Sequence, residues 1–124
     1  MVWKGVIIEE SLEDNGLLKL VQIVKTIKSS LESEKERGIL HFHNIEVDDS
    51  KKEEFIKKAK ISIKQGWYLH ICKDKNMVIV FKGKSFDLTK GQKDKFTEAE
   101  NYGLSIGILE EQLQIEELID NPWD

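Results

Sequence analysis

The sequence contains one cysteine, one proline and one arginine, and its apolar residues never form a long unbroken run. A lone cysteine, Cys72, cannot form an internal disulfide, so we expect a reducing, cytoplasmic compartment. No segment approaches the roughly 18–20 apolar residues of a transmembrane helix, and the N-terminus lacks an apolar signal region, so we expect no membrane association. Because Arg37 is the only arginine, bidentate recognition of phosphate or guanine is nearly excluded, and nucleic acid is not an expected partner.

The residues that are present suffice for one folded domain. The 124 residues are 40% hydrophobic and 34% charged, a composition that excludes a disordered chain and supplies one buried core. We therefore expect a single domain over residues 1–124, with a core over 1–103 and a docked C-terminal extension over 104–124.

Charge is distributed unevenly along the chain. Residues 1–50 carry a net charge of −4, residues 51–95 carry +8 with thirteen lysines, and residues 96–124 carry −8 with no basic residue. Opposite charges attract over a screening length of about 8 Å at physiological salt. Apolar residues are interleaved with the acids of 104–124, so we expect this extension to dock, on its own subunit or a neighbour, mainly through apolar burial. Its acids should lie near lysines of a helix at 50–65 or of the hairpin that follows.

Periodicity and turn residues predict the secondary structure. Strands are expected over 2–9, 21–30, 39–47, 67–73 and 77–82, with 84–88 extending the last hairpin. Helices are expected over 11–20, 50–65 and 90–102, followed by a mixed apolar and acidic extension with a helical turn. Residues 17–31 also fit one long helix, but their density of β-branched residues favours a strand from about residue 21.

This order of elements predicts an α+β fold. Strand, helix, strand, strand, helix, strand is the ferredoxin-like βαββαβ order, an antiparallel sheet with helices on one face. An extra hairpin strand and the acidic, partly helical extension would be added to it. The other face of the sheet would be left for water, a partner or a ligand.

Three motifs are spread along the chain: WKGVIIEESL at 3–12, GWY at 66–68 and YGLSIGI at 102–108. Together they resemble a family of small uncharacterised prokaryotic proteins. The resemblance implies a stand-alone domain and favours the strand over 21–30. It also implies that His43 has a counterpart within its strand, but the motifs name no reaction.

Candidate site residues lie on two of the expected strands. Side chains alternate along a strand, so His41 and His43 share one face of theirs, and Tyr68, His70 and Cys72 share one face of another. If both sets lie on the same side of the sheet, pairing two sheets face to face would leave a ligand pocket lined by His41, His43, Tyr68 and His70.

The same histidines and Cys72 are also candidate zinc ligands. However, the first strand is expected between the two sets, which separates them by roughly 10 Å, whereas zinc ligands lie within about 2.3 Å of the ion. We therefore expect no metal or other cofactor in a single chain. Cys72 with His70 two residues away is a weak nucleophile pair, because a lone strand cysteine more often packs in the core.

Four acids follow the first strand: Glu9, Glu10, Glu13 and Asp14. They lack the Asp-x-Asp-x-Asp-Gly spacing of a calcium loop, and we interpret them as a solvated loop and first helical turn.

These observations favour a self-associating small-molecule-binding protein that uses its open sheet face. Monomers rarely leave a large apolar face uncovered, so we expect a homo-oligomer. The alternative is a protein-interaction or regulatory module that uses the lysine-rich 51–95 surface and the acidic extension. A metal-dependent or cysteine-based enzyme is the third interpretation, and no catalytic residue is assigned.

Overall fold

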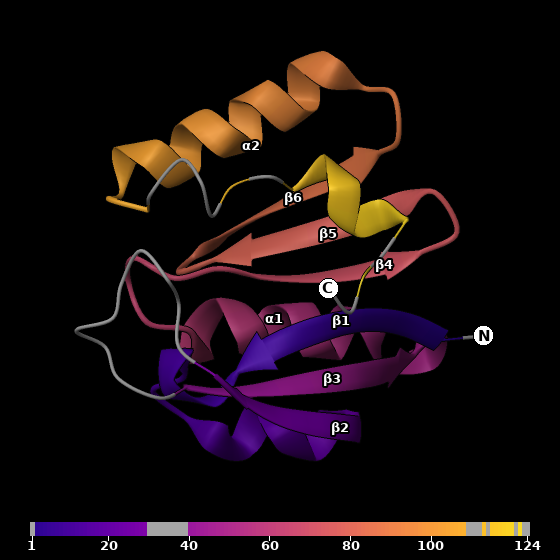
Figure 1. Ribbon diagram of the computed structural model, residues 1–124, viewed down its shortest axis with the longest axis vertical. Helices are drawn as coiled ribbons and strands as arrows, with labels where there is room; N and C mark the ends of the chain where they lie inside the picture. The colour runs from indigo at the N-terminus through magenta and orange to yellow at the C-terminus, as the bar shows by residue number, and fades with distance from the viewer. Residues whose placement is uncertain (1, 30–39, 109–112, 114, 121, 123–124) are drawn as a thin grey trace.

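The computed structural model describes residues 2–29, 40–108, 113, 115–120 and 122, which form an α+β fold with one antiparallel sheet of six strands (Figure 1). The strand order is β2-β3-β1-β4-β5-β6. The strands are β1 (Val2–Ile8), β2 (Gln22–Ser29), β3 (Leu40–Asp48), β4 (Leu69–Lys73), β5 (Asn76–Phe81) and β6 (Lys84–Thr89). The helices are α1 (Lys52–Ser62) and α2 (Lys93–Ser105), with short 3-10 segments η1 (Glu9–Ser11), η2 (Asn15–Leu20), η4 (Asp49–Lys51) and η6 (Glu116–Ile119).

The expected α+β class is confirmed, whereas the exact ferredoxin-like topology is not. β5 and β6 extend the sheet beyond β4, so the complete strand order differs from that of a four-stranded ferredoxin-like sheet. The strand expected over 21–30 is present as β2, rather than as part of one long helix.

The α-helix expected over 11–20 is replaced by η1 and η2. Between them Leu12 is extended and forms an isolated antiparallel bridge with Ile63, which pulls the chain out of helical geometry. Asp14, rather than Ser11, then caps η2 by accepting a hydrogen bond from the Gly16 N–H at 2.8 Å. A glycine this early in the segment disfavours a regular α-helix.

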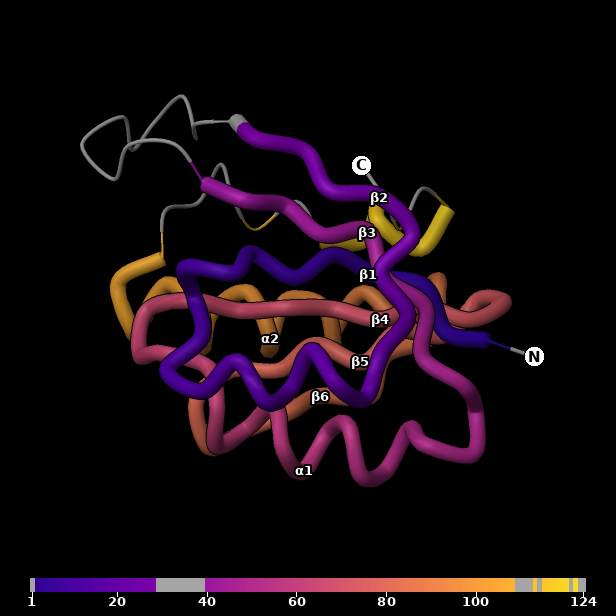
Figure 2. Tube along the Cα trace, turned by 90° about the horizontal axis from the view of Figure 1, so that it is seen from below, coloured from indigo at the N-terminus to yellow at the C-terminus, as the bar shows by residue number. Residues whose placement is uncertain are grey.

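Two layers of apolar side chains lie on opposite faces of the sheet. α1 and η2 cover one face, where Phe55 of α1 packs in a cluster with Ile7, Ile45 and Ile71. α2 and the C-terminal extension cover the other face of β4–β6, around Phe81. Figure 2 shows α1 and η2 along one side of the strands and η6 on the opposite side. Thus half of the face that was expected to be open is covered.

The C-terminal extension contributes apolar side chains to this second layer. Its buried residues are Ile108, Leu113, Ile115 and Ile119. Its acids form ion pairs with lysines that flank the start of α2: Glu116 with Lys93 at 3.0 Å and Asp120 with Lys90 at 2.8 Å. We expected these acids near lysines of α1 or of the β4–β5 hairpin, but their partners flank the start of α2 instead.

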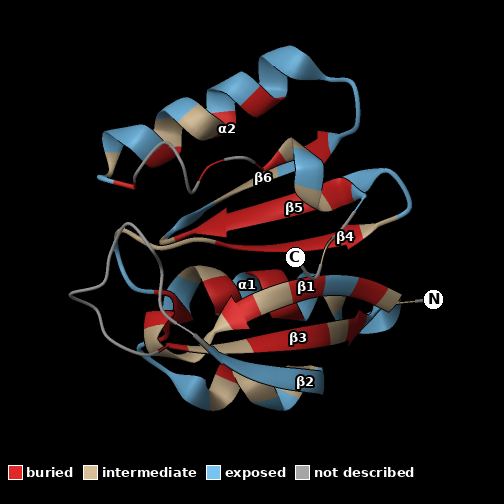
Figure 3. Ribbon diagram, viewed as in Figure 1, coloured by how far each residue is buried: buried red, intermediate tan, exposed pale blue. Residues whose placement is uncertain are grey.

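Burial follows the strand order (Figure 3). β4 and β5 are buried along most of their length, whereas the edge strand β2 is exposed. Within the described ranges, no helix is long and apolar enough to cross a membrane.

Candidate functional site

The strand register separates the predicted site residues into two groups. Residues that pair directly across antiparallel strands point to the same face of the sheet. His43 pairs with Ile7, which packs beneath α1. His70 pairs with Val6, the preceding residue of β1, which points to the other face. The α1 side therefore carries His41 and His43, and the opposite side carries Tyr68, His70 and Cys72. The prediction that they share one pocket within a chain is wrong, because a single-residue difference in pairing reverses the face.

The group on β4 lies beneath the C-terminal extension. The Nε2 atom of His70 is 2.8 Å from the carbonyl oxygen of Pro122, and Sγ of Cys72 is 3.5 Å from that of Leu118. Burial lowers the pKa of His70 to about 4, although the bond to Pro122 partly opposes this shift. Burial also raises the pKa of Cys72 and of Tyr68 to about 12, so the thiol stays protonated and is a poor nucleophile at neutral pH.

The group on β3 meets the two carboxylates that follow β1. Ile8 is the last residue of β1 and pairs with Phe42, which lies between the two histidines. The turn of η1 therefore places Glu9 and Glu10 next to His41 and His43. His41 Nδ1 lies 2.6 Å from Glu10 Oε2, and its backbone N–H donates to Glu10 Oε1 at 2.7 Å. His43 Nε2 lies 3.0 Å from Glu9 Oε1.

A hydroxyl of the edge strand completes this arrangement. Thr26 pairs with His43 across β2 and β3, and its Oγ1 lies 2.8 Å from His43 Nδ1. We name the five residues Glu9, Glu10, Thr26, His41 and His43 the His–Glu cluster. Within it the His43 side chain is only 8% exposed, whereas those of Glu9, Glu10 and His41 are 34–39% exposed and open to solvent.

Three members of the cluster are potential metal ligands that lie close to one another. One ligand atom each from Glu9, Glu10 and His41 lies within 4.8 Å of the other two. Partial burial raises the pKa of Glu10, but hydrogen bonds from the His41 backbone and imidazole outweigh it, and the net pKa is lowered. Glu10 is therefore ionised at neutral pH, as a carboxylate ligand must be.

The two other acids that follow β1 are not part of this cluster. Glu13 pairs with Lys82 at 2.6 Å, and Asp14 pairs with Lys58 at 2.9 Å. The sequence interpretation of a solvated loop fits these exposed pairs but missed Glu9 and Glu10. Their position in the sequence could have indicated the cluster. The two carboxylates directly follow β1, and β1 pairs with β3, the strand that carries His41 and His43.

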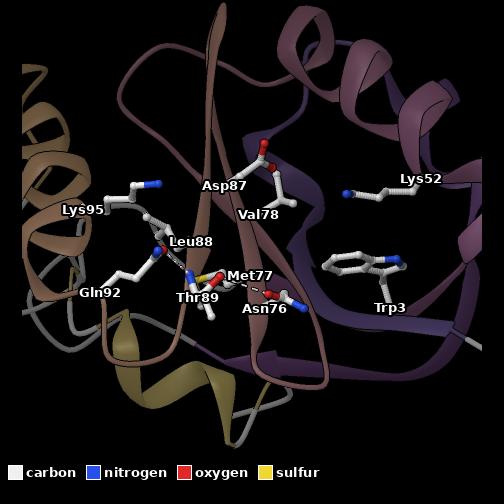
Figure 4. A pocket seen from close by; sticks show the side chains of 10 residues that line it. All are labelled: Trp3, Lys52, Asn76, Met77, Val78, Asp87, Leu88, Thr89, Gln92 and Lys95. Atoms are coloured by element: carbon white, nitrogen blue, oxygen red, sulfur yellow. Dashed lines mark hydrogen bonds between the residues drawn. The ribbon is translucent and has the colours of Figure 1, made fainter.

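A separate pocket of about 310 Å³ lies beside β5 and β6 (Figure 4). Lys52 of α1, whose Nζ is 4.6 Å from the centre of the Trp3 ring, and Lys95 of α2 approach Asp87 from opposite sides. The Thr89 hydroxyl donates to the side-chain oxygen of Asn76, and the Thr89 backbone N–H donates to that of Gln92. These residues do not belong to the His–Glu cluster. Because the charged groups enter from opposite sides, the pocket does not gather ligand atoms around one point as the His–Glu cluster does.

Comparison of the chain with models of protein families, with curated proteins and with solved structures finds no match. What the His–Glu cluster can bind therefore follows from its own side chains.

Proposed function

We propose that this protein binds a divalent transition-metal ion, with Zn²⁺ as the reference ion, through Glu9, Glu10 and His41. The observation that supports the proposal is the convergence of their three ligand atoms within 4.8 Å. Carboxylate oxygen and imidazole nitrogen are both ordinary zinc ligands. Three protein ligands would leave one tetrahedral position for water or a small ligand.

The ligand atoms must move slightly to reach the spacing of a coordinated ion. Two atoms that each lie about 2.0–2.2 Å from one zinc ion are separated by roughly 3.0–3.6 Å. The 2.6 Å contact of His41 with Glu10 must open slightly, because the ion replaces the shared proton. Both side chains are about one third exposed, Glu10 in η1 and His41 in β3, so they have room to rotate.

The mixed ligand set favours some ions over others. Imidazole suits zinc, copper, iron and nickel, whereas magnesium and calcium prefer sites made only of oxygen. We therefore expect Zn²⁺ to bind much more tightly than Mg²⁺ or Ca²⁺.

Calorimetric titration of the intact chain with Zn²⁺ tests the proposal. We expect one ion per chain, and a loss of affinity of at least about tenfold in His41→Ala and in Glu9→Gln. The control is Glu13→Gln, which removes a neighbouring carboxylate that pairs with Lys82 outside the cluster. Absence of saturable binding, or equal affinity in the His41→Ala variant, contradicts the proposal.

We also propose that the chain self-associates through the sheet face opposite α1. The register places Ile8, Phe42 and Ile27 in one apolar row across β1, β3 and β2, and Ile27 is 41% exposed. Light scattering at micromolar concentration should report two chains, and Ile27→Glu should report one. Ile61→Glu, at a 70% exposed position of α1, should remain associated. A single-chain mass for the unsubstituted protein would rule out self-association.

A further inference from the structure

We infer that Thr26 and His43 hold Glu9 in its metal-binding orientation, an inference that rests on the proposed metal site. The three side chains form one hydrogen-bonded series that crosses three neighbouring segments. Thr26 Oγ1 of β2 lies 2.8 Å from His43 Nδ1 of β3, and His43 Nε2 lies 3.0 Å from Glu9 Oε1 of η1. Thr26 and His43 thus act as positioning residues, while Glu9 contacts the ion.

The proton positions follow from the chemistry of Glu9. A carboxylate oxygen only accepts hydrogen bonds, so His43 Nε2 must carry the proton and donate it. In a neutral imidazole the other nitrogen, Nδ1, is then an acceptor, and the Thr26 hydroxyl donates to it. The Glu9 carboxylate therefore selects this tautomer of His43, and the hydrogen bond from Thr26 stabilises it.

Burial and hydrogen bonding together exclude His43 from direct coordination. Its side chain is 8% exposed, and both ring nitrogens already have partners within 3.0 Å. His41 differs, because its side chain is 35% exposed and its Nδ1 contacts Glu10, which is itself one of the proposed ligands. The two histidines, equivalent in the sequence as His-Phe-His, therefore have different tasks.

The expected effect on metal affinity is that of losing a residue that hydrogen-bonds a metal ligand without contacting the ion. Loss of such a partner typically lowers metal affinity by about 10–100-fold. Thr26 is exposed on an edge strand, so replacing its hydroxyl by a methyl group leaves no cavity. We expect Thr26→Val to bind Zn²⁺ about tenfold more weakly, and Thr26→Ser, which keeps the hydroxyl, to bind like the unsubstituted chain.

Two measurements on the full chain test this inference. The first is NMR of the imidazole nitrogens of His43 without metal, where we expect the Nε2–H tautomer, and a tautomer mixture in Thr26→Val. The second is Zn²⁺ titration of the unsubstituted chain, Thr26→Val and Thr26→Ser, with Thr89→Val on β6 as the matched control.

The outcomes separate this inference from the proposed function. Weaker binding in Thr26→Val, rescued in Thr26→Ser and absent in Thr89→Val, supports both. Equal affinity in Thr26→Val and the unsubstituted chain, or an Nδ1–H tautomer of His43, overturns the positioning role and leaves the metal site standing. No zinc binding by the unsubstituted chain overturns the proposed function itself.

Discussion

The imidazole of His70 donates from Nε2 to the carbonyl oxygen of Pro122 at 2.8 Å and so joins β4 to the C-terminal extension across 52 residues of sequence. His70 is buried, and Nε2 must carry a proton because a carbonyl oxygen only accepts. Protonating Nδ1 as well would place a charge in an apolar layer, and burial lowers the pKa of His70 to about 4 for this reason.

Stability should therefore decrease as the pH falls below neutrality. The unfolded chain takes up a proton at His70 near pH 6.5, whereas the native chain stays neutral until about pH 4. The free energy of unfolding then falls across this window, by up to about 3 kcal/mol from this one group, and the loss is complete below pH 4. Urea unfolding at pH 7.0, 6.0 and 5.0 measures it.

The control for this prediction is His70→Gln, which keeps an N–H donor for Pro122 but does not titrate. Its unfolding free energy should change much less between pH 7.0 and 5.0. Exposed carboxylates with lowered pKa, such as Asp14 and Asp49, lose their stabilising effect at lower pH and affect both proteins equally. The same pH dependence in both proteins would contradict the assignment to His70.

The C-terminal extension should contribute to stability through its apolar residues. Ile115 is fully buried in the layer with Phe81, so Ile115→Ala leaves a cavity and should lower the free energy of unfolding by about 2–4 kcal/mol. Leu104→Ala, at a 45% exposed position, should change it by less than about 0.5 kcal/mol. Thermal or urea unfolding distinguishes these outcomes, and equal stabilities would show that the extension is not docked in solution.

Gly5 should not tolerate a side chain. It lies in β1 between β3 and β4, and a Cβ atom there would clash with the carbonyl oxygen of His70. That oxygen belongs to the backbone of a paired strand and cannot move alone, so Gly5→Ala should destabilise the fold by at least about 3 kcal/mol. Val6→Ala, whose half-buried side chain points to the other face, should cost about 1 kcal/mol by the same unfolding measurement. Similar losses in both variants would contradict the steric explanation.

The periodicity of the sequence was enough to predict the strands and the main helices. β-branched residues correctly favoured a strand in place of a long helix at Gln22–Ser29, and α1 lies within the helix predicted over 50–65. The α-helix predicted before β2 was wrong. The bridge between Leu12 and Ile63 is a tertiary contact, which the helix propensity of a local segment cannot reveal.

The candidate site was predicted only in part, because the sequence does not show which face of the sheet each strand's side chains occupy. Alternation correctly placed His41 with His43 and His70 with Cys72, but it does not say how the two strands face each other. That depends on the pairing of both strands with β1, where neighbouring residues Val6 and Ile7 point to opposite faces. Glu9 and Glu10 were missed because their partners are 31–34 residues away and meet them only through this register.

Metal binding at the His–Glu cluster should move the imidazole hydrogen of His41. In the metal-free chain His41 Nδ1 donates its hydrogen to the ionised Glu10 carboxylate at 2.6 Å, and an ion that takes both atoms as ligands must displace it. A neutral imidazole bound through Nδ1 keeps one hydrogen on Nε2, so the metal-bound ring is the other tautomer. NMR of the imidazole nitrogens of His41 should therefore report Nδ1–H without Zn²⁺ and Nε2–H with it. Glu13→Gln should show the same change, whereas an Nδ1–H tautomer at saturating Zn²⁺ would show that the ion does not bind through this nitrogen.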